Sequence, residues 1–334
     1  MATFLLGSII KIGAFKPFPG VNEIVIKKSL RNYNDTATIK LPATAVLRQS
    51  ATQTQSIDTA KQFKRGDKVN IQLAYNRRYR VEFEGFITRV NKATPCMLEC
   101  EGYAFQLREK TINKIYRKAS LKAILSDLIE GTDIVLAQDN YEVTVDKMDF
   151  VKYPRYKALA TLAKDLAGSV NIWFEGNVLF VGLKYLYFNA KNSSWKHDVH
   201  YMVDFNIVRD GEMKERLAGD SNYEVELYNR SADGKVTTAR VGVVNSNIQR
   251  KKIQAVSDMS ARKEMAEAIE KDKNYTGFDG KINAFLEPFC KPGFKAKYTD
   301  QRYPEMSGFY LVESVETKYS RSGARRKIEI SFKL

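Results

Sequence analysis

The sequence predicts a β-rich α+β fold, with two β-barrel domains and a small α/β domain inserted between them. Both ends of the 334-residue chain alternate apolar and polar residues, whereas the middle changes to helical spacing. One strand pattern, a glycine-aromatic pair opening a β-branched run that ends in valine, occurs in residues 79–90 (YRVEFEGFITRV) and again in residues 303–315 (YPEMSGFYLVESV). We therefore expect domains at 1–110, 111–190 and 191–334.

The first domain is predicted from a hairpin. Residues 69–75 alternate apolar and polar side chains, and Asn76-Arg77-Arg78 forms a turn into a second alternating strand that contains Val81 and Phe83. The pattern indicates a sheet with one buried face.

The inserted domain is predicted from two capped helices. Ser120 is a good N-cap for a helix that Gly131 would end, and Pro154 begins a second helix that Gly168 would end. Strands are expected at 141–145 and 171–181, and the second contains a tight turn at 175–177. This order of elements is typical of a small α/β unit.

The third domain is β-rich with one helix, expected over residues 258–273. Strands are expected at 202–208, 223–228 and 235–243, although their placement in the sheet is not fixed by the sequence. The alternating residues 327–334 indicate that the chain ends on a strand.

The same order of signals occurs at both ends of the chain. Gly66 opens a strand and Gly85-Phe86 a later one, and Gly293 and Gly308-Phe309 repeat this order. A duplication would explain it, and so would chance similarity between two hairpins. If the chain is duplicated, residues 64–105 and 291–334 should align strand for strand as parts of two separate barrels.

The net charge of +15 favours acidic surfaces or nucleic acid as neighbours. The basic residues form short clusters in or beside predicted turns and strand ends, namely Lys27-Lys28, Arg77-Arg78, Arg250-Lys251-Lys252 and Arg325-Arg326-Lys327. Solvated strand edges carry such side chains to discourage aggregation, and no nucleic-acid-binding motif accompanies them. We favour the solvated interpretation.

Candidate catalytic and metal-binding residues are few. The chain has three cysteines, Cys96, Cys100 and Cys290, and two histidines, His197 and His200. Cys96 and Cys100 lie four residues apart without further ligands nearby, so we interpret them as buried apolar side chains. The histidines lie in residues 195–201, which are predicted as a loop that enters a strand, and we expect no metal role for them. No catalytic signature occurs, so we expect no enzyme, no cofactor and no metal site.

The run from Phe63 to Ile112 resembles the first barrel of the baseplate hub proteins of contractile-tailed phages, including Mu-like and late-control D-type tail proteins and the related hub part of VgrG spikes. The matching features are Gly66-Asp67, the strand FEGFI at 83–87 and the segment 99–107 with its leucine-rich exit. Residues 120–134 and 155–182 are similar to the helix-strand domain of these proteins, and residues 308–334 resemble the closing hairpin of their second barrel.

The resemblance implies a structural protein with two tube-like barrels. Three such chains would form a homotrimeric ring that joins a six-fold tail tube to a three-fold spike and initiates tube assembly, because paired barrels let three chains imitate six. It implies the tail tube protein, the spike and other baseplate proteins as partners, and a place in the virion tail or baseplate after assembly in the bacterial cytoplasm. Nucleic acid would only pass through the ring, and no membrane insertion is expected. The alternative is a basic β-barrel protein that binds nucleic acid.

Overall fold

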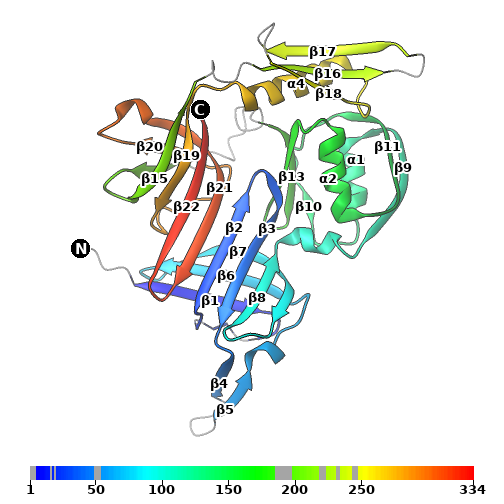
Figure 1. Cartoon of the computed structure of the whole chain (residues 1–334). Helices are drawn as coiled ribbons and strands as arrows, with labels where there is room; N and C mark the ends of the chain where they lie inside the picture. The colour runs from blue at the N-terminus through cyan, green and yellow to red at the C-terminus, as the bar shows by residue number, and fades with distance from the viewer. Residues whose placement is uncertain are drawn as a thin grey trace.

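The computed structural model describes residues 5–15, 17–18, 20–48, 54–184, 198–217, 223–230, 234–242 and 247–334. Its largest element is a 12-stranded sheet to which both ends of the chain contribute (Figure 1). The first half of this sheet contains β1 (Leu6–Ile12), β2 (Glu23–Ser29), β3 (Asn32–Leu41), β6 (Lys68–Tyr75), β7 (Arg78–Asn91) and β8 (Cys96–Glu101). The second half contains β14 (Asp198–Met202), β15 (Ile207–Arg216), β19 (Gly277–Ala284), β20 (Lys295–Thr299), β21 (Gly308–Ser320) and β22 (Gly323–Lys333).

Smaller elements surround this sheet. The insertion consists of β9 (Thr111–Ser120), α1 (Leu121–Ile129), β10 (Val135–Leu136), β11 (Thr144–Pro154), α2 (Arg155–Asp165), β12 (Val170–Glu175) and β13 (Val178–Leu183). A separate sheet and helix follow β15, namely β16 (Tyr223–Arg230), β17 (Val236–Gly242), β18 (Asn247–Lys252) and α4 (Met259–Lys273). The hairpin of β4 (Thr44–Arg48) and β5 (Thr54–Asp58) projects from the first half as an arm (Figure 1). Short 3-10 turns are η1 (Thr59–Lys61), η2 (Tyr103–Leu107) and η5 (Pro304–Met306).

Two helices begin at or next to the residue where the sequence predicts their start. The Ser120 hydroxyl accepts a hydrogen bond from the backbone N–H of Ala123 at 3.2 Å, and the Asp258 carboxylate accepts one from Ala261 at 2.7 Å. Each cap satisfies an N–H group that the first turn of a helix leaves unpaired. The predicted starts of α1 and α4 are therefore confirmed.

Two predicted strands are placed differently. β11 begins at Thr144 instead of residue 141. Residues 202–208 are not one strand, because β14 ends at Met202 and a turn with Asp204 at φ +65° leads into β15. The Asn206 side chain stabilises this turn, since it accepts a hydrogen bond from the Met202 N–H and donates one to the His200 carbonyl, both at 2.8 Å.

The apolar core is divided among several clusters. Each half of the large sheet has its own cluster, and a third cluster joins the insertion to the sheet of β16. The third cluster contains Leu125 and Leu159 of the insertion together with Val225, Ile253 and Met265, all fully buried. Residues assigned from the sequence to the third domain thus share a core with the insertion. The division at residues 110 and 190 stays a prediction.

The β-rich fold is confirmed, but the arrangement as two separate barrels is not. The order of the sheet is β1-β6-β7-β8-β3-β2-β21-β22-β19-β15, and β20 joins β21 on one side and β14 on the other. The two halves are continuous because β2 pairs with β21, from Glu23 opposite Ser320 to Ser29 opposite Ser314. The strands of the described residues close no barrel. None of the helices in these residues is long and apolar enough to cross a bilayer.

Candidate functional site: the contact between the two sheet halves

The two halves of the large sheet have the same strand order. In the first half the order is β1-β6-β7-β8-β3-β2, and in the second it is β14-β20-β21-β22-β19-β15. The central strands β6, β7 and β8 form an antiparallel meander, and so do β20, β21 and β22. The first strand of each half differs, since β1 runs antiparallel to β6 whereas β14 runs parallel to β20. The strand order is therefore repeated, but both segments lie in one continuous sheet, which contradicts the two separate barrels that the duplication predicted.

The turns that lead into the two meanders are alike. Gly66 has φ +90° and Gly293 has φ +91°, a conformation that only glycine adopts without strain. The Gly66 N–H donates to the carbonyl of Ile87, and the Gly293 N–H donates to that of Val312, both at 2.8 Å. In each half the N–H of the same strand residue, Ile87 or Val312, donates a second hydrogen bond of 2.9 Å to the carbonyl of the residue after the glycine.

A β-bulge lies at the same place in both long strands. The extra residue is Thr88 in β7 and Glu313 in β21, each directly after the residue bonded by the entry turn. The pairs on either side of the bulge are Ile87–Cys100 and Arg89–Glu99 in the first half, and Val312–Ile330 and Ser314–Glu329 in the second. A bulge changes the direction of the side chains around it. A bulge between equivalent residue pairs in both halves is therefore specific evidence of the repeat.

The register corrects the alignment expected from the sequence. Val69 pairs with Gly85, and Ala296, at the same spacing from its entry glycine, pairs with Tyr310. Gly85 therefore corresponds to Tyr310 and not to Gly308, which is two residues earlier. Gly85 is required by packing, because a Cβ there would lie 2.1 Å from the Glu101 carbonyl oxygen.

The two halves meet where β2 lies beside β21. Leu30, directly after β2, is 1% exposed and packs in one cluster with Leu311 of the second half and Trp173 of the insertion. Its N–H donates to the carbonyl of the bulge residue Glu313 at 3.0 Å, and the Glu313 carboxylate accepts a hydrogen bond of 2.7 Å from Arg31. The contact thus combines a backbone ladder, a buried leucine and a charged pair.

A buried ion pair lies in the same contact. The Arg326 guanidinium on β22 donates to the Glu82 carboxylate on β7 at 2.5 and 3.0 Å, and the side chains are only 1% and 5% exposed. Glu82 is the extra residue of a second bulge in β7, which turns its carboxylate towards the other half. Burial lowers the pKa of Arg326, but attraction and hydrogen bonding to Glu82 raise it more, and the net shift is upward. Arg326 therefore stays charged.

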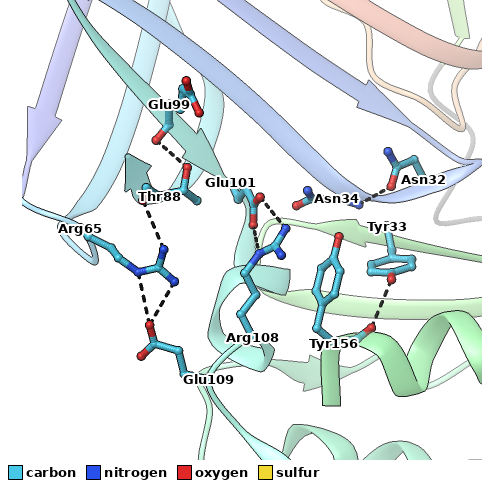
Figure 2. A network of polar contacts seen from close by, with 10 residues as sticks. All are labelled: Asn32, Tyr33, Asn34, Arg65, Thr88, Glu99, Glu101, Arg108, Glu109 and Tyr156. Carbon is cyan, nitrogen blue, oxygen red and sulfur yellow. Dashed lines mark hydrogen bonds and ion pairs between the residues drawn. The ribbon is translucent and has the colours of Figure 1, made fainter. Parts of the chain in front are cut away.

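The insertion also contacts the first half through a polar network (Figure 2). Arg108 donates to Glu101 at 2.5 and 2.6 Å, and its guanidinium lies 4.1 Å from the ring centre of Tyr156 on α2. Tyr33 donates to the Tyr156 carbonyl at 3.2 Å. Burial and the neighbouring Tyr156 raise the pKa of Tyr33 well above its usual value, so this hydroxyl remains a hydrogen-bond donor.

The hairpin of β12 and β13 lies near the contact between the halves. Glu175 at its turn accepts a hydrogen bond of 2.8 Å from Lys291 of the second half. The same turn lines a cavity of about 320 Å³ together with Lys28 and Asp35 of the first half. The insertion thus contacts both halves of the sheet.

The basic clusters are only partly solvated. Arg326 is buried against Glu82, contrary to the solvated interpretation, because a bulge in another strand supplies its counter-ion. Arg250 and Arg240 both pair with Glu226 at 3.1 Å, and Lys251 donates to the Ala167 carbonyl at 3.0 Å. Several basic side chains that could attract an acidic partner therefore make contacts within the chain.

The candidate ligands are dispersed. Cys96 and Cys100 on β8 pack in the core of the first half, and burial raises the pKa of Cys100. His200 lies on β14, where its Nε2 is 2.9 Å from the Thr299 hydroxyl, and His197 lies outside the described residues. Within the described part of the chain no three His, Cys, Asp or Glu residues gather as metal ligands. The absence of a catalytic or metal site stays a prediction.

No protein-family model and no curated protein matches this chain in sequence. Similar solved structures include a tail protein from Neisseria meningitidis MC58, with a TM-score of 0.68 at 13% identity over 97% of this chain and 96% of that chain. The 43 kDa tail protein of prophage MuSo2 from Shewanella oneidensis has a TM-score of 0.66 at 11% identity over 98% of both chains. The E. coli c3393 protein, a type VI secretion component described as similar to the T4 tail proteins gp27 and gp5, has a TM-score of 0.57 at 10% identity over 97% of this chain and 77% of that one. The predicted resemblance is thus confirmed as a shared fold.

Proposed function

We propose that this chain is a structural hub subunit of a contractile phage tail or a related injection system. Three copies would form a ring that joins the six-fold tail tube to a three-fold spike and starts assembly of the tube. Its partners would be the tube protein, the spike and other baseplate proteins. The fold shared with the tail proteins and with the type VI secretion component supports this class of function.

The observation that carries the proposal is the internal repeat. Gly66 and Gly293 begin equivalent turns, and Thr88 and Glu313 are equivalent bulges. A chain with two similar halves offers a hexameric neighbour two similar surfaces, so three chains offer six. A single enzyme-like or ligand-binding unit would not need this repetition.

The test combines a solution mass with a nucleation assay. We expect light scattering at micromolar concentration to give the mass of three chains, and we expect the ring to shorten the lag of tube formation by the cognate tube protein. A monomer that leaves the lag unchanged would contradict the proposal.

The alternative function, a basic protein that binds nucleic acid, is suggested by the net charge of +15. Binding through phosphate contacts would give an affinity for oligonucleotides that falls steeply with salt. We expect only weak binding without sequence preference, because Arg240, Arg250 and Arg326 are engaged by carboxylates of the chain. Tight, salt-dependent binding by a monomer would favour the alternative.

A further inference from the structure

A cleft of about 480 Å³ lies where the insertion meets the sheet of β16 (Figure 1). We infer that this cleft, called the basic cleft below, binds an extended segment of another protein that carries carboxylate side chains. It is lined by residues 147–149, 164–165, 229–230, 252 and 254–255. These residues belong to β11, α2, β16, β18 and the segment after β18, and none of them lies in the large sheet. The inference is therefore independent of the proposed ring.

The two sides of the basic cleft are fixed relative to each other. The Asp146 N–H of β11 donates to the Ala255 carbonyl at 2.8 Å, and Lys251 of β18 donates to the Ala167 carbonyl after α2 at 3.0 Å. Met148 and Ala255 line the cleft and are buried in the core that the insertion shares with the sheet of β16. The cleft is thus built from folded elements that pack on one another.

The charge in the basic cleft is not balanced within the chain. Its lining has four basic and two acidic side chains. One of the acids, Asp149, is already paired with Arg117 at 2.5 Å. Lys164, Arg230 and Lys252 are exposed, and among the described residues none of the three forms an ion pair or a side-chain hydrogen bond. Three cations from three different elements therefore line one cleft and are available to an anionic partner.

The basic run at residues 250–252 is divided between two tasks. Successive side chains of a strand point to opposite faces, so Lys252 lines the cleft while Lys251 points to the other side of β18. Burial and the neighbouring Lys184 and Lys273 lower the pKa of Lys251. Positive charge is thus concentrated where the insertion meets this sheet, and a carboxylate-bearing partner would relieve it.

The rest of the lining favours a polypeptide over a nucleic acid. Asp149 and Asp165 lie in the same cleft, and burial raises the pKa of Asp165 although Lys164 acts to lower it. Both carboxylates would repel a chain with a phosphate on every unit, whereas they accept hydrogen bonds from peptide N–H groups. The amides of Asn229 and Gln254 can pair with the backbone groups that an extended segment leaves open.

Aromatic side chains give a second reason. Single-stranded nucleic acids are bound largely by stacking of their bases on aromatic rings. The described residues that line the basic cleft include no aromatic ring. Its volume is within the range of about 300–1,000 Å³ that is usual for ligand pockets, so a few residues of a partner segment can enter it.

A glutamate peptide tests the basic cleft. The probe is a rhodamine-labelled hexaglutamate peptide, and its binding to the full chain at low salt is followed by fluorescence anisotropy. Lys164→Gln combined with Lys252→Gln removes two cations of the cleft. Lys263→Gln combined with Lys271→Gln is the control, because it removes the same charge from exposed positions of α4. We expect the cleft variant to raise Kd by about fivefold or more and the control to leave it nearly unchanged.

Both double variants are expected to keep the thermal midpoint, since all four lysines are exposed. An oligothymidylate of equal charge is the second probe, and we expect it to bind more weakly than the peptide. No binding of the peptide, or equal losses of affinity in the two variants, would overturn the inference. Tighter binding of the oligothymidylate through the same two lysines would also overturn it, in favour of a nucleic acid. A monomer that binds the peptide through Lys164 and Lys252 would support the inference and contradict the proposed ring.

Discussion

Arg326 and Glu82 lie 244 residues apart in the chain and form a doubly hydrogen-bonded ion pair buried between the two halves of the sheet. Arg326 also donates to the Leu286 carbonyl and the Thr317 hydroxyl, both at 3.0 Å. The guanidinium is therefore paired on several sides, which a buried charge requires. This pair makes the orientation of the two halves depend on one side chain from each.

Removing one partner of this pair should be costly. We expect Glu82→Ala to lower the free energy of unfolding by about 3–5 kcal/mol, because it leaves a buried guanidinium without its counter-ion. Urea denaturation followed by fluorescence measures the change. Glu109→Ala is the control, since Glu109 and its partner Arg65 are 73% and 52% exposed, and solvated pairs contribute little. Equal losses in the two variants would show that the buried pair does not hold the halves together.

The two glycine-aromatic pairs should respond differently to alanine. At Gly85 a Cβ would meet the Glu101 carbonyl oxygen at 2.1 Å, and a backbone atom cannot move aside cheaply. At Gly308 the nearest atom is Cε of Lys333, at 2.3 Å, and this flexible side chain can rotate away. We expect Gly85→Ala to cost about 1–3 kcal/mol and Gly308→Ala clearly less, as measured by thermal unfolding. The reverse order would contradict the register that aligns Gly85 with Tyr310.

The sequence predicts local elements of this fold better than it predicts their contacts. Ser120 marks the start of α1 because a cap needs only the next few residues. The sequence analysis predicts no individual strands within residues 5–58, and β2 proves to be the strand that joins the halves.

The buried contact between the halves joins residues that are far apart in the chain, so local sequence patterns do not predict it. Arg326 lies in an Arg-Arg-Lys run that reads as a solvated strand end, and its burial depends on a bulge at Glu82 in a distant strand. Leu30 follows β2 and belongs to no alternating apolar pattern. Its burial therefore depends on β21 lying beside β2. One signal was present in the sequence, because Gly66 and Gly293 begin equivalent turns in the two segments, although these segments form one sheet and not two separate barrels.

The stability of the fold should fall as the pH rises through the titration of Asp35. Burial raises the pKa of this carboxyl from 3.8 to about 6, although Lys28, with its Nζ 4.0 Å away, acts to lower it. Between these two pH values the folded state binds more protons than the unfolded state, so the free energy of unfolding decreases as pH increases, by roughly 1–3 kcal/mol. Below about pH 4 this contribution is fully present, and it is lost above about pH 6.

Asp35→Asn isolates this effect. Other carboxyls titrate in the same range, so the quantity to compare is the difference between the unfolding free energies of the two proteins at pH 4 and pH 7. We expect the variant to gain stability relative to the original chain as the pH rises. A constant difference across this range would show that Asp35 titrates in the folded state as it does in the unfolded chain.

Deleting the insertion should disrupt more than the insertion itself. The sequence predicts a separate domain at residues 111–190. In the structure, however, Val225, Ile253 and Met265 are fully buried in a core that they share with α1 and α2. Replacing residues 111–183 by a short glycine-serine linker would expose this apolar face, and we expect aggregation or loss of cooperative unfolding.

Replacing the arm, residues 44–57, by a similar linker is the matched control. That change should leave a soluble chain with a single thermal transition, because Val46 and most neighbouring arm residues are exposed. A soluble, cooperatively unfolding chain without residues 111–183 would show that the sheet of β16 and α4 folds without the insertion.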